Sequence, residues 1–241
     1  MQKSTIVLLL ISIFSVNFSC QAQKKSENPY TFKDPSWDGS GKVYLGREIS
    51  QVMGFSDSMC SIPADLRISP FSNNIAVSQN LPITSKSVVA DIGAGSGYYT
   101  FRISPLVSEG KVYAVDIQEE AVDYIRKRSE ELEVENVFAV KGTEKSPNLP
   151  EGEVDLVIMV DVYHELSYPQ EMLSAIYKSL KPDGKILLLE YKGEDPSIPI
   201  KPLHKMTEKQ AEKELKANGF ELMKNGKFLP IQHYLIFEKA K

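Results

Sequence analysis

The stretch of this chain best suited to bind a small ligand is an apolar run that ends in an acid and is followed by three alternate glycines. Its sequence is Val88-Val89-Ala90-Asp91-Ile92-Gly93-Ala94-Gly95-Ser96-Gly97. Glycine lets the backbone turn sharply and lets a ligand approach where a Cβ atom would collide. In α/β proteins, a strand followed by a glycine turn and a helix binds ligands at the carboxyl end of the strand. We therefore expect a ligand at this turn, with the Asp91 carboxylate accepting hydrogen bonds from a cationic amino-acid group.

The glycine spacing and a second acid narrow the class of ligand. A dinucleotide fingerprint needs its third glycine three residues after the second, and Tyr98 stands at that position. Asp116 ends the next apolar run, 25 residues after Asp91. A carboxylate at that point can receive both hydroxyls of a ribose, in NAD as in other nucleosides. The residues predict a nucleoside ligand and disfavour a nicotinamide dinucleotide.

Candidate catalytic residues follow the apolar run of residues 154–160. Tyr163 and His164 come directly after Asp161 and Val162. Because an imidazole titrates near neutral pH, His164 is a candidate general base; the alternative is a polar residue that only orders its loop. His204 lies in a long, proline-containing loop and is either a substrate contact or a surface feature.

Strand and helix patterns alternate along most of the chain. Strands are predicted over residues 87–92, 111–117, 137–140, 154–160, 185–190, 220–227 and 232–238. Helices are predicted over residues 98–107, 121–132 and 172–180, and from a capping box at Thr207 to Gly219. This alternation favours an α/β fold with a doubly wound, mostly parallel sheet and helices on both faces, and the closely spaced last two strands favour an antiparallel edge.

The segment D-x-G-x-G-x-G at Asp91–Gly97 resembles motif I of the class I S-adenosylmethionine-dependent methyltransferases. Later segments, among them M-V-D-V-Y-H-E and P-I-K-P-L-H-K-M-T, resemble a largely uncharacterised group of bacterial methyltransferase-domain proteins over residues 40 to 239. The resemblance implies a Rossmann-like sheet of seven strands with an antiparallel last strand, and S-adenosylmethionine as the cofactor. The N-P-P-Y type motif of enzymes that methylate amino groups of nucleic acids is absent, which favours a small-molecule acceptor.

The resemblance also implies roles for individual residues. The implied cofactor-binding residues are Asp91, Gly93, Gly95, Gly97, Asp116, Ile117, Glu144 and Asp161. Among them, Asp116 binds the ribose, Ile117 packs on the adenine and Asp161 supports the methionine moiety. Thr143 stands where many relatives have an acid, so the adenine amino group is assigned to Glu144. The implied catalytic residues are His164, Tyr163 and His204, in a site without a metal ion.

Composition and the N-terminal residues suggest one globular domain that is exported. The chain has 241 residues and a net charge of −4, which offers no basic surface for nucleic acid. Residues 1–22 are predicted to be a signal peptide, because the apolar run Ile6–Phe14 is shorter than the ~20 residues that span a membrane. Ser19-Cys20 resembles the end of a lipobox, whereas Cys20-Gln21-Ala22 fits ordinary cleavage. The expected location is periplasmic, either free or anchored to the envelope through a lipid on Cys20.

The rest of the chain is predicted as three segments: a tether over residues 23–39, an N-terminal helical cap over 40–86 and a methyltransferase core over 87–241. The cap is expected to begin with a helix over Lys42–Met53, where the apolar residues have helical spacing. Two functions remain open: methyl transfer to a small molecule, or a non-catalytic envelope protein that keeps the fold to bind a nucleoside-like ligand. The second is motivated by the export signal, since S-adenosylmethionine is made in the cytoplasm.

Overall fold

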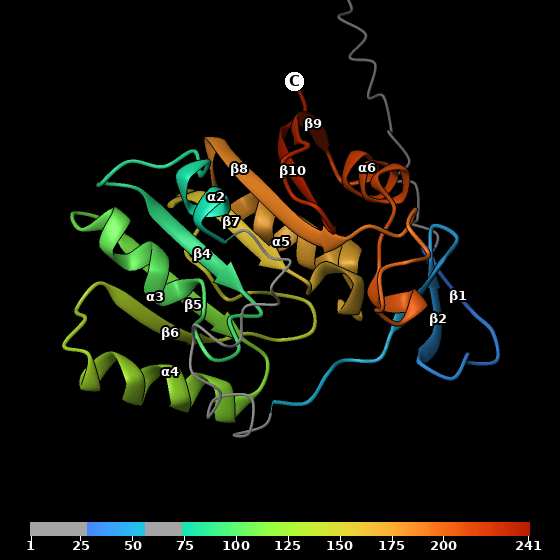
Figure 1. Cartoon of the computed structure of the whole chain (residues 1–241), viewed down its shortest axis with the longest axis horizontal. Helices are drawn as coiled ribbons and strands as arrows, with labels where there is room; N and C mark the ends of the chain where they lie inside the picture. The colour runs from blue at the N-terminus through green and yellow to red at the C-terminus, as the bar shows by residue number, and fades with distance from the viewer. Residues whose placement is uncertain (1–27, 56–73) are drawn as a thin grey trace, which may run out of the picture.

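The computed structural model describes residues 28–55 and 74–241, and Figure 1 shows their arrangement. The predicted signal peptide, Cys20 and the start of the predicted tether lie outside these ranges. Within them, no helix is both long enough and apolar enough to span a membrane.

A central sheet of seven strands forms the body of the protein. The strands are β4 (Val88–Ile92), β5 (Lys111–Asp116), β6 (Val137–Lys141), β7 (Val154–Val160), β8 (Leu180–Tyr191), β9 (Phe220–Gly226) and β10 (Gln232–Lys239). They lie in the order β6-β5-β4-β7-β8-β10-β9, and β10 is antiparallel to both of its neighbours while the first five strands are parallel. The predicted α/β fold, the seven strands and the antiparallel last strand are confirmed.

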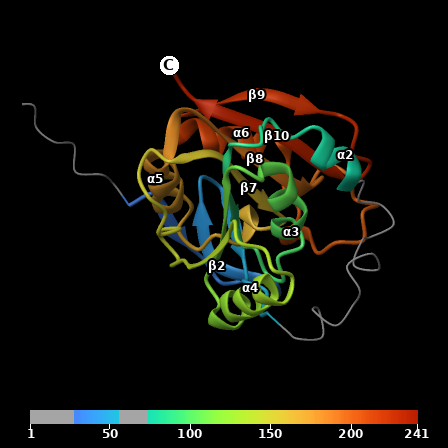
Figure 2. The same ribbon diagram turned by 90° about the vertical axis from the view of Figure 1, so that its left-hand side faces the viewer.

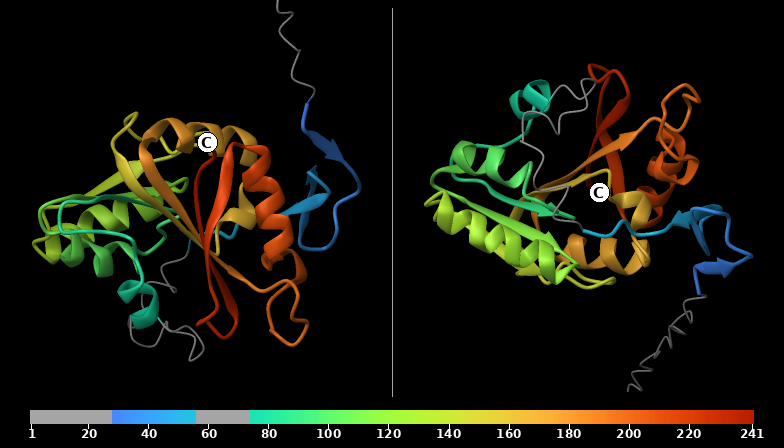
Figure 3. Two further views of the ribbon diagram at one scale, coloured as in Figure 1. Left: turned by 90° about the horizontal axis from the view of Figure 1, so that it is seen from above. Right: turned by 60° about the horizontal axis from the view of Figure 1, so that its bottom comes forward.

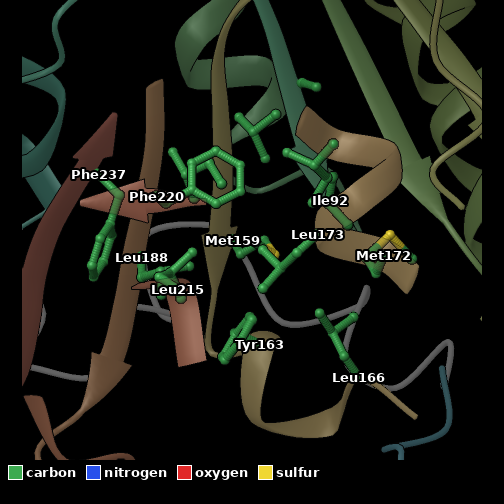
Figure 4. Packing of buried hydrophobic residues seen from close by; sticks show 14 of the residues in the cluster. Ile92, Met159, Tyr163, Leu166, Met172, Leu173, Leu188, Leu215, Phe220 and Phe237 are labelled. Carbon is green, nitrogen blue, oxygen red and sulfur yellow. The ribbon is translucent and has the colours of Figure 1, made fainter. Parts of the chain in front are cut away.

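Helices cover both faces of this sheet (Figures 2 and 3). The helices are α2 (Asn74–Gln79), α3 (Thr100–Ile103), α4 (Glu119–Glu131), α5 (Pro169–Ser179) and α6 (Glu208–Ala217), with short 3-10 turns η1 (Ser104–Val107), η2 (Tyr163–Glu165) and η3 (Pro202–His204). Side chains alternate along β7, so Val157 and Met159 pack with α5 and α6 (Figure 4), whereas Leu156 and Ile158 pack on the other face with α2, α3 and α4. A strand buried on both faces explains the continuous apolar run at residues 154–160.

A second, three-stranded antiparallel sheet replaces the helix predicted at the N-terminus. Its strands are β1 (Tyr30–Phe32), β2 (Gly39–Tyr44) and β3 (Arg47–Ser50). The helix prediction for Lys42–Met53 is wrong because Leu45 and Gly46 have φ of 46° and 94°, a two-residue hairpin turn that reverses the chain between β2 and β3. The tether prediction is also wrong over β1, because Tyr30 is buried against Tyr44 in the small core of this sheet.

A buried ion pair joins the small sheet to the large domain. The Arg47 guanidinium donates from Nε to Glu214 Oε1 at 2.7 Å and from Nη2 to Glu214 Oε2 at 2.9 Å. Its third branch donates to the backbone oxygen of His164 at 3.0 Å. Arg47 thereby ties β3, α6 and the loop after β7 together.

Replacing Arg47 with methionine is expected to lower the free energy of unfolding by about 3–5 kcal/mol, because Glu214 is left as a buried, uncompensated charge. The matched control is Arg126→Met, which removes an exposed pair with Asp123 on α4 and is expected to cost less than about 1 kcal/mol. Urea denaturation of both variants measures the difference. Equal losses in the two variants would contradict the structural role of Arg47.

Candidate functional site

A cavity of about 630 Å³ opens at the carboxyl ends of the parallel strands. Loops following β4, β5, β6 and β7 line it, together with the end of β8 and the loop that contains η3. The predicted site residues that line it are Gly93, Gly95, Asp116, Ile117, Glu144, Asp161, His164 and His204. Residues from five separate parts of the sequence therefore meet at one edge of the sheet.

The glycine turn after β4 is shaped for close packing on one side and for a ligand on the other. Gly93 and Gly95 have φ of 73° and 53°, which side-chain-bearing residues rarely adopt. A Cβ on Gly93 would lie 2.4 Å from a methyl of Val162, whereas a Cβ on Gly95 would meet nothing within 4 Å. Gly95 therefore presents its backbone to open space in the cavity. Gly97 packs against Phe101 and is not part of the lining.

Asp91 does not line the cavity, contrary to the prediction that it binds ligand directly. Its carboxylate is buried and accepts a hydrogen bond from Thr100 Oγ1 at 2.7 Å. Burial raises the pKa of Asp91 to about 6. Asp91 thus connects the end of β4 to the first turn of α3 and holds the glycine turn between them.

Asp116, at the end of β5, faces the cavity and is held by the backbone. Its Oδ2 accepts from Gly95 N and its Oδ1 from Gln118 N, both at 2.9 Å. A carboxylate has about four acceptor positions, so about two remain for a ligand. The neighbouring Ile117 side chain is 38% exposed at the same wall of the cavity.

In the loop after β6, Thr143 stands at the position where an acid was expected, and it has a structural role there. Thr143 Oγ1 accepts from Ser146 N at 3.0 Å, and Thr143 N donates to Ser146 O at 2.8 Å. Thr143 therefore stabilises the turn. Glu144 is exposed at the mouth of the cavity and is available to a ligand.

Asp161 follows β7 in a left-handed conformation, with φ of 52°. Its Oδ2 accepts from Gln232 Nε2 at 2.9 Å, while its Oδ1 is buried and has no partner among the described residues. Burial, followed by the nearby Glu190 carboxylate, raises the pKa of Asp161 to about 8. An unpaired buried carboxyl oxygen beside a cavity is suited to a ligand that donates hydrogen bonds or carries positive charge.

Tyr163, in contrast, lies outside the cavity. Figure 4 shows its ring in the same buried cluster as Leu173 and Leu215, and its hydroxyl donates to Glu214 Oε2 at 2.9 Å. The prediction that Tyr163 touches the reacting groups is therefore not supported by its position. Its place in the sequence beside His164 was misleading because Tyr163 packs in the core whereas His164 lines the cavity.

Three side chains converge at the other end of the cavity. His164 Nε2 lies 3.3 Å from His204 Nδ1, and Glu165 Oε1 lies 3.3 Å from His204 Nδ1 and 3.8 Å from His164 Nε2. The far nitrogen of His164, Nδ1, lies 2.6 Å from Oε2 of Glu190, so it donates its proton to that carboxylate. Both His164 and Glu190 are buried.

The two imidazoles have opposite electrostatic environments. Burial lowers the pKa of His164, but the Glu190 carboxylate outweighs it and raises the pKa on balance. Burial and the neighbouring His164 lower the pKa of His204. Of the two imidazoles, His164 is therefore the one that more readily takes a second proton and becomes charged, while His204 stays neutral.

Sequence reasoning assigned no role to Glu165 or Glu190. The available signal was positional: Glu165 follows His164 directly, and Glu190 ends a predicted strand whose neighbour in the sheet is β7. Acids at the carboxyl ends of adjacent parallel strands meet at one edge. Gln118 was also missed, and it holds the segment before residue 56 over the cavity by donating to Met53 O at 3.0 Å.

Comparison with known proteins agrees with this architecture. A family model described as "Methyltransferase domain" matches residues 90–186. The ubiquinone/menaquinone biosynthesis C-methyltransferase UbiE of Wigglesworthia glossinidia brevipalpis is 27% identical over 105 residues, 43% of this chain and 42% of that protein. The tRNA U34 carboxymethyltransferase of Desulfotalea psychrophila is 31% identical over 113 residues, 46% of this chain and 34% of that protein. The matches thus span less than half of these curated relatives.

Among solved structures, a SAM dependent methyltransferase from Aquifex aeolicus superposes with a TM-score of 0.68 at 25% identity. The superposition covers 76% of this chain and 98% of that one. The similarity therefore extends over the central sheet and its helices and not only over the glycine turn.

Asp91→Asn is expected to stabilise the protein at alkaline pH. The folded state holds the Asp91 proton more tightly than the unfolded chain, whose aspartate pKa is about 3.9, so this carboxyl lowers stability as pH rises from about 4 to about 6. At pH 8 the free energy of unfolding of the variant should exceed that of the wild type by about 2 kcal/mol. At pH 4 the two free energies should be nearly equal. Thermal denaturation at both pH values tests this, with exposed Asp123→Asn as the control. A stabilisation independent of pH would refute it.

Proposed function

We propose that this chain, which carries a class I S-adenosylmethionine-dependent methyltransferase domain, transfers a methyl group to a small-molecule acceptor. The observation that carries the proposal is one cavity lined by two groups of residues: Gly95, Asp116 and Asp161, here called the first wall, and His164 and His204, the second wall. The first wall suits a nucleoside with a charged amino-acid end, and the second suits an acceptor that loses a proton.

The residues of the first wall fit S-adenosylmethionine. The open backbone at Gly95 leaves room for a ligand, Asp116 keeps acceptor positions for two ribose hydroxyls, and the unpaired Oδ1 of Asp161 suits the ammonium group of the methionine moiety. When bound, the cofactor supplies an electrophilic methyl group on a sulfonium. The chain's residues have to position the acceptor against it and exclude water.

The second wall supplies acid–base groups. Glu190 fixes His164 with its proton on Nδ1, which leaves Nε2 as the acceptor of a proton. His204 and Glu165 lie within reach of the same nitrogen, so a proton taken there can be passed between them. Tyr163 takes no part in this exchange, because its hydroxyl is committed to Glu214.

The shape and charge of the site favour a small acceptor. A cavity of about 630 Å³ is in the range of small-molecule sites, and a net charge of −4 gives no general attraction for nucleic acid. Because matched relatives include a ubiquinone/menaquinone biosynthesis C-methyltransferase, hydroquinones and phenols are the first acceptors to examine.

Calorimetric titration with S-adenosylmethionine and its demethylated product tests the cofactor site. Wild-type protein should bind both at micromolar concentrations, and Asp116→Ala should weaken binding by about 100-fold, since two charge-assisted hydrogen bonds are lost. Asp123→Ala, an exposed acid on α4, should bind as the wild type does. A folded wild-type protein that binds neither ligand would refute the proposal.

A second arm of the test measures methyl transfer. Release of the demethylated cofactor in the presence of a hydroquinone or phenol would establish catalysis. Tight binding without release to any acceptor of a broad panel would instead favour the non-catalytic ligand-binding function.

We also propose export of the chain, on the pattern of residues 1–22 alone. Intact-mass spectrometry of protein purified from the native host should show loss of the leader, with a diacylglyceryl mass on Cys20 if the lipobox is used. A full-length, unmodified mass would contradict export.

A further inference from the structure

Two histidines and a glutamate that line the cavity place three potential metal-ligand atoms close together. The separations among His164 Nε2, His204 Nδ1 and Glu165 Oε1 are 3.3, 3.3 and 3.8 Å. A point equidistant from all three atoms lies about 2.0 Å from each, which is the bond length of Zn²⁺ to imidazole nitrogen and carboxylate oxygen. We propose that His164, His204 and Glu165 bind a divalent transition-metal ion, with Zn²⁺ the best match.

The groups behind the three ligands support this assignment. The Nδ1 of His164 donates to the buried Glu190 carboxylate at 2.6 Å, which directs Nε2 towards the proposed ion. Metal-binding histidines characteristically donate their other ring proton to a carboxylate in this way. The second oxygen of Glu165, Oε2, accepts from Met53 N at 3.1 Å, which leaves Oε1 for the ion.

The backbone at His164 is also fixed. Its carbonyl oxygen accepts from Arg47 Nη1 at 3.0 Å and from Ser50 Oγ at 3.2 Å. Both donors come from the N-terminal sheet. The ligand on η2 is therefore held from two sides, by β3 and by the end of β8.

Without an ion, a single proton pairs only two of the three atoms at a time. His204 Nδ1 lies at the same distance from His164 Nε2 and from Glu165 Oε1, so a proton on it can be donated fully to only one of them. Both imidazoles are buried, where an unpaired polar atom is costly. One divalent ion satisfies all three atoms together.

A site with three protein ligands is of the open type. Catalytic zinc sites generally have three protein ligands and one exchangeable position. All three proposed ligands line the cavity, so that position is available to an oxygen or sulfur atom of the acceptor, whose pKa a divalent ion lowers. With an ion bound, His164 Nε2 is a ligand and no longer a general base, so the ion's acidification of the acceptor, which releases its proton to solvent, takes the place of proton removal by the imidazole. This step rests on the proposed methyl-transfer function, whereas the metal site itself does not.

The test uses the purified full-length chain after treatment with a chelator. Zn²⁺ titrated by calorimetry should bind one ion per chain with a dissociation constant of micromolar or below, and Co²⁺ should give the visible absorption of a low-symmetry, four-coordinate site. His164→Ala, His204→Ala and Glu165→Ala should each weaken binding at least 100-fold. Glu190→Gln should weaken it about 10–100-fold through His164.

The chain offers a matched control. Its third histidine, His233, pairs with Glu194 away from these ligands, and His233→Ala should bind metal as the wild type does. Folding of every variant is checked by circular dichroism. Lack of stoichiometric binding by folded wild type, or unchanged binding in folded His204→Ala, would overturn the proposal.

S-adenosylmethionine titrated into the same variants separates the two proposals. His204→Ala should keep cofactor binding, because the side-chain partners of His204 among the described residues are His164 and Glu165 and not the cofactor residues. A wild-type protein that binds the cofactor but binds no metal would refute the metal site alone. The reverse result would refute the proposed function alone.

Discussion

Buried carboxylates have to be compensated, and the manner in which each one is compensated determines the arrangement of this site. Removing an ionised carboxylate from water without partners is costly. Glu214 accepts hydrogen bonds from Arg47, Glu190 accepts one from His164, and Asp116 accepts two from backbone N–H groups. Asp161 is compensated on one oxygen only. The site is thus largely prearranged, and the one carboxylate oxygen of the described lining that is buried without a partner lies where a ligand can complete it.

The same requirement gives the small N-terminal sheet a part in the site. Arg47 and Ser50 from β3 both donate to the carbonyl oxygen of His164, and the segment after β3 donates from Met53 N to Glu165. In Figure 1 this segment runs along the edge of the central sheet where the parallel strands end. The sheet therefore supports His164 and Glu165, where we propose that the acceptor binds, and the glycine turn supports Asp116, where we propose that the cofactor binds.

The inner strands of the central sheet, such as β4 and β7, could be predicted from the sequence because they are buried on both faces and show as apolar runs. The start of α6 could be predicted as well, since Thr207 accepts from Gln210 N as a capping box requires. The N-terminal hairpin could not, because its turn places Leu45 at positive φ, where glycine or asparagine is the usual signal. Its apolar residues also fit helical spacing by coincidence.

Within the site, residues that act through the backbone or through distant partners were the ones misjudged. Asp91 stands at the expected strand end, yet Thr100 turns its carboxylate inwards. Tyr163 adjoins His164 in sequence, but its hydroxyl reaches Glu214, 51 residues later. The cluster of His164, Glu165 and His204 depends on a loop that returns to the cavity 40 residues after His164. Such a juxtaposition has no local signature in the chain.

The most direct test of a shared cavity is a ¹H–¹⁵N NMR titration of the isotope-labelled protein with S-adenosylmethionine. The amides of Gly93, Gly95 and Gln118 should shift most, because they stand at the turn and strand end assigned to the cofactor. The amide of Gly110, which precedes β5 at the opposite edge of the sheet, should not move. Saturable shifts confined to the first group would support the account. Shifts centred on β9, or none at all, would contradict it.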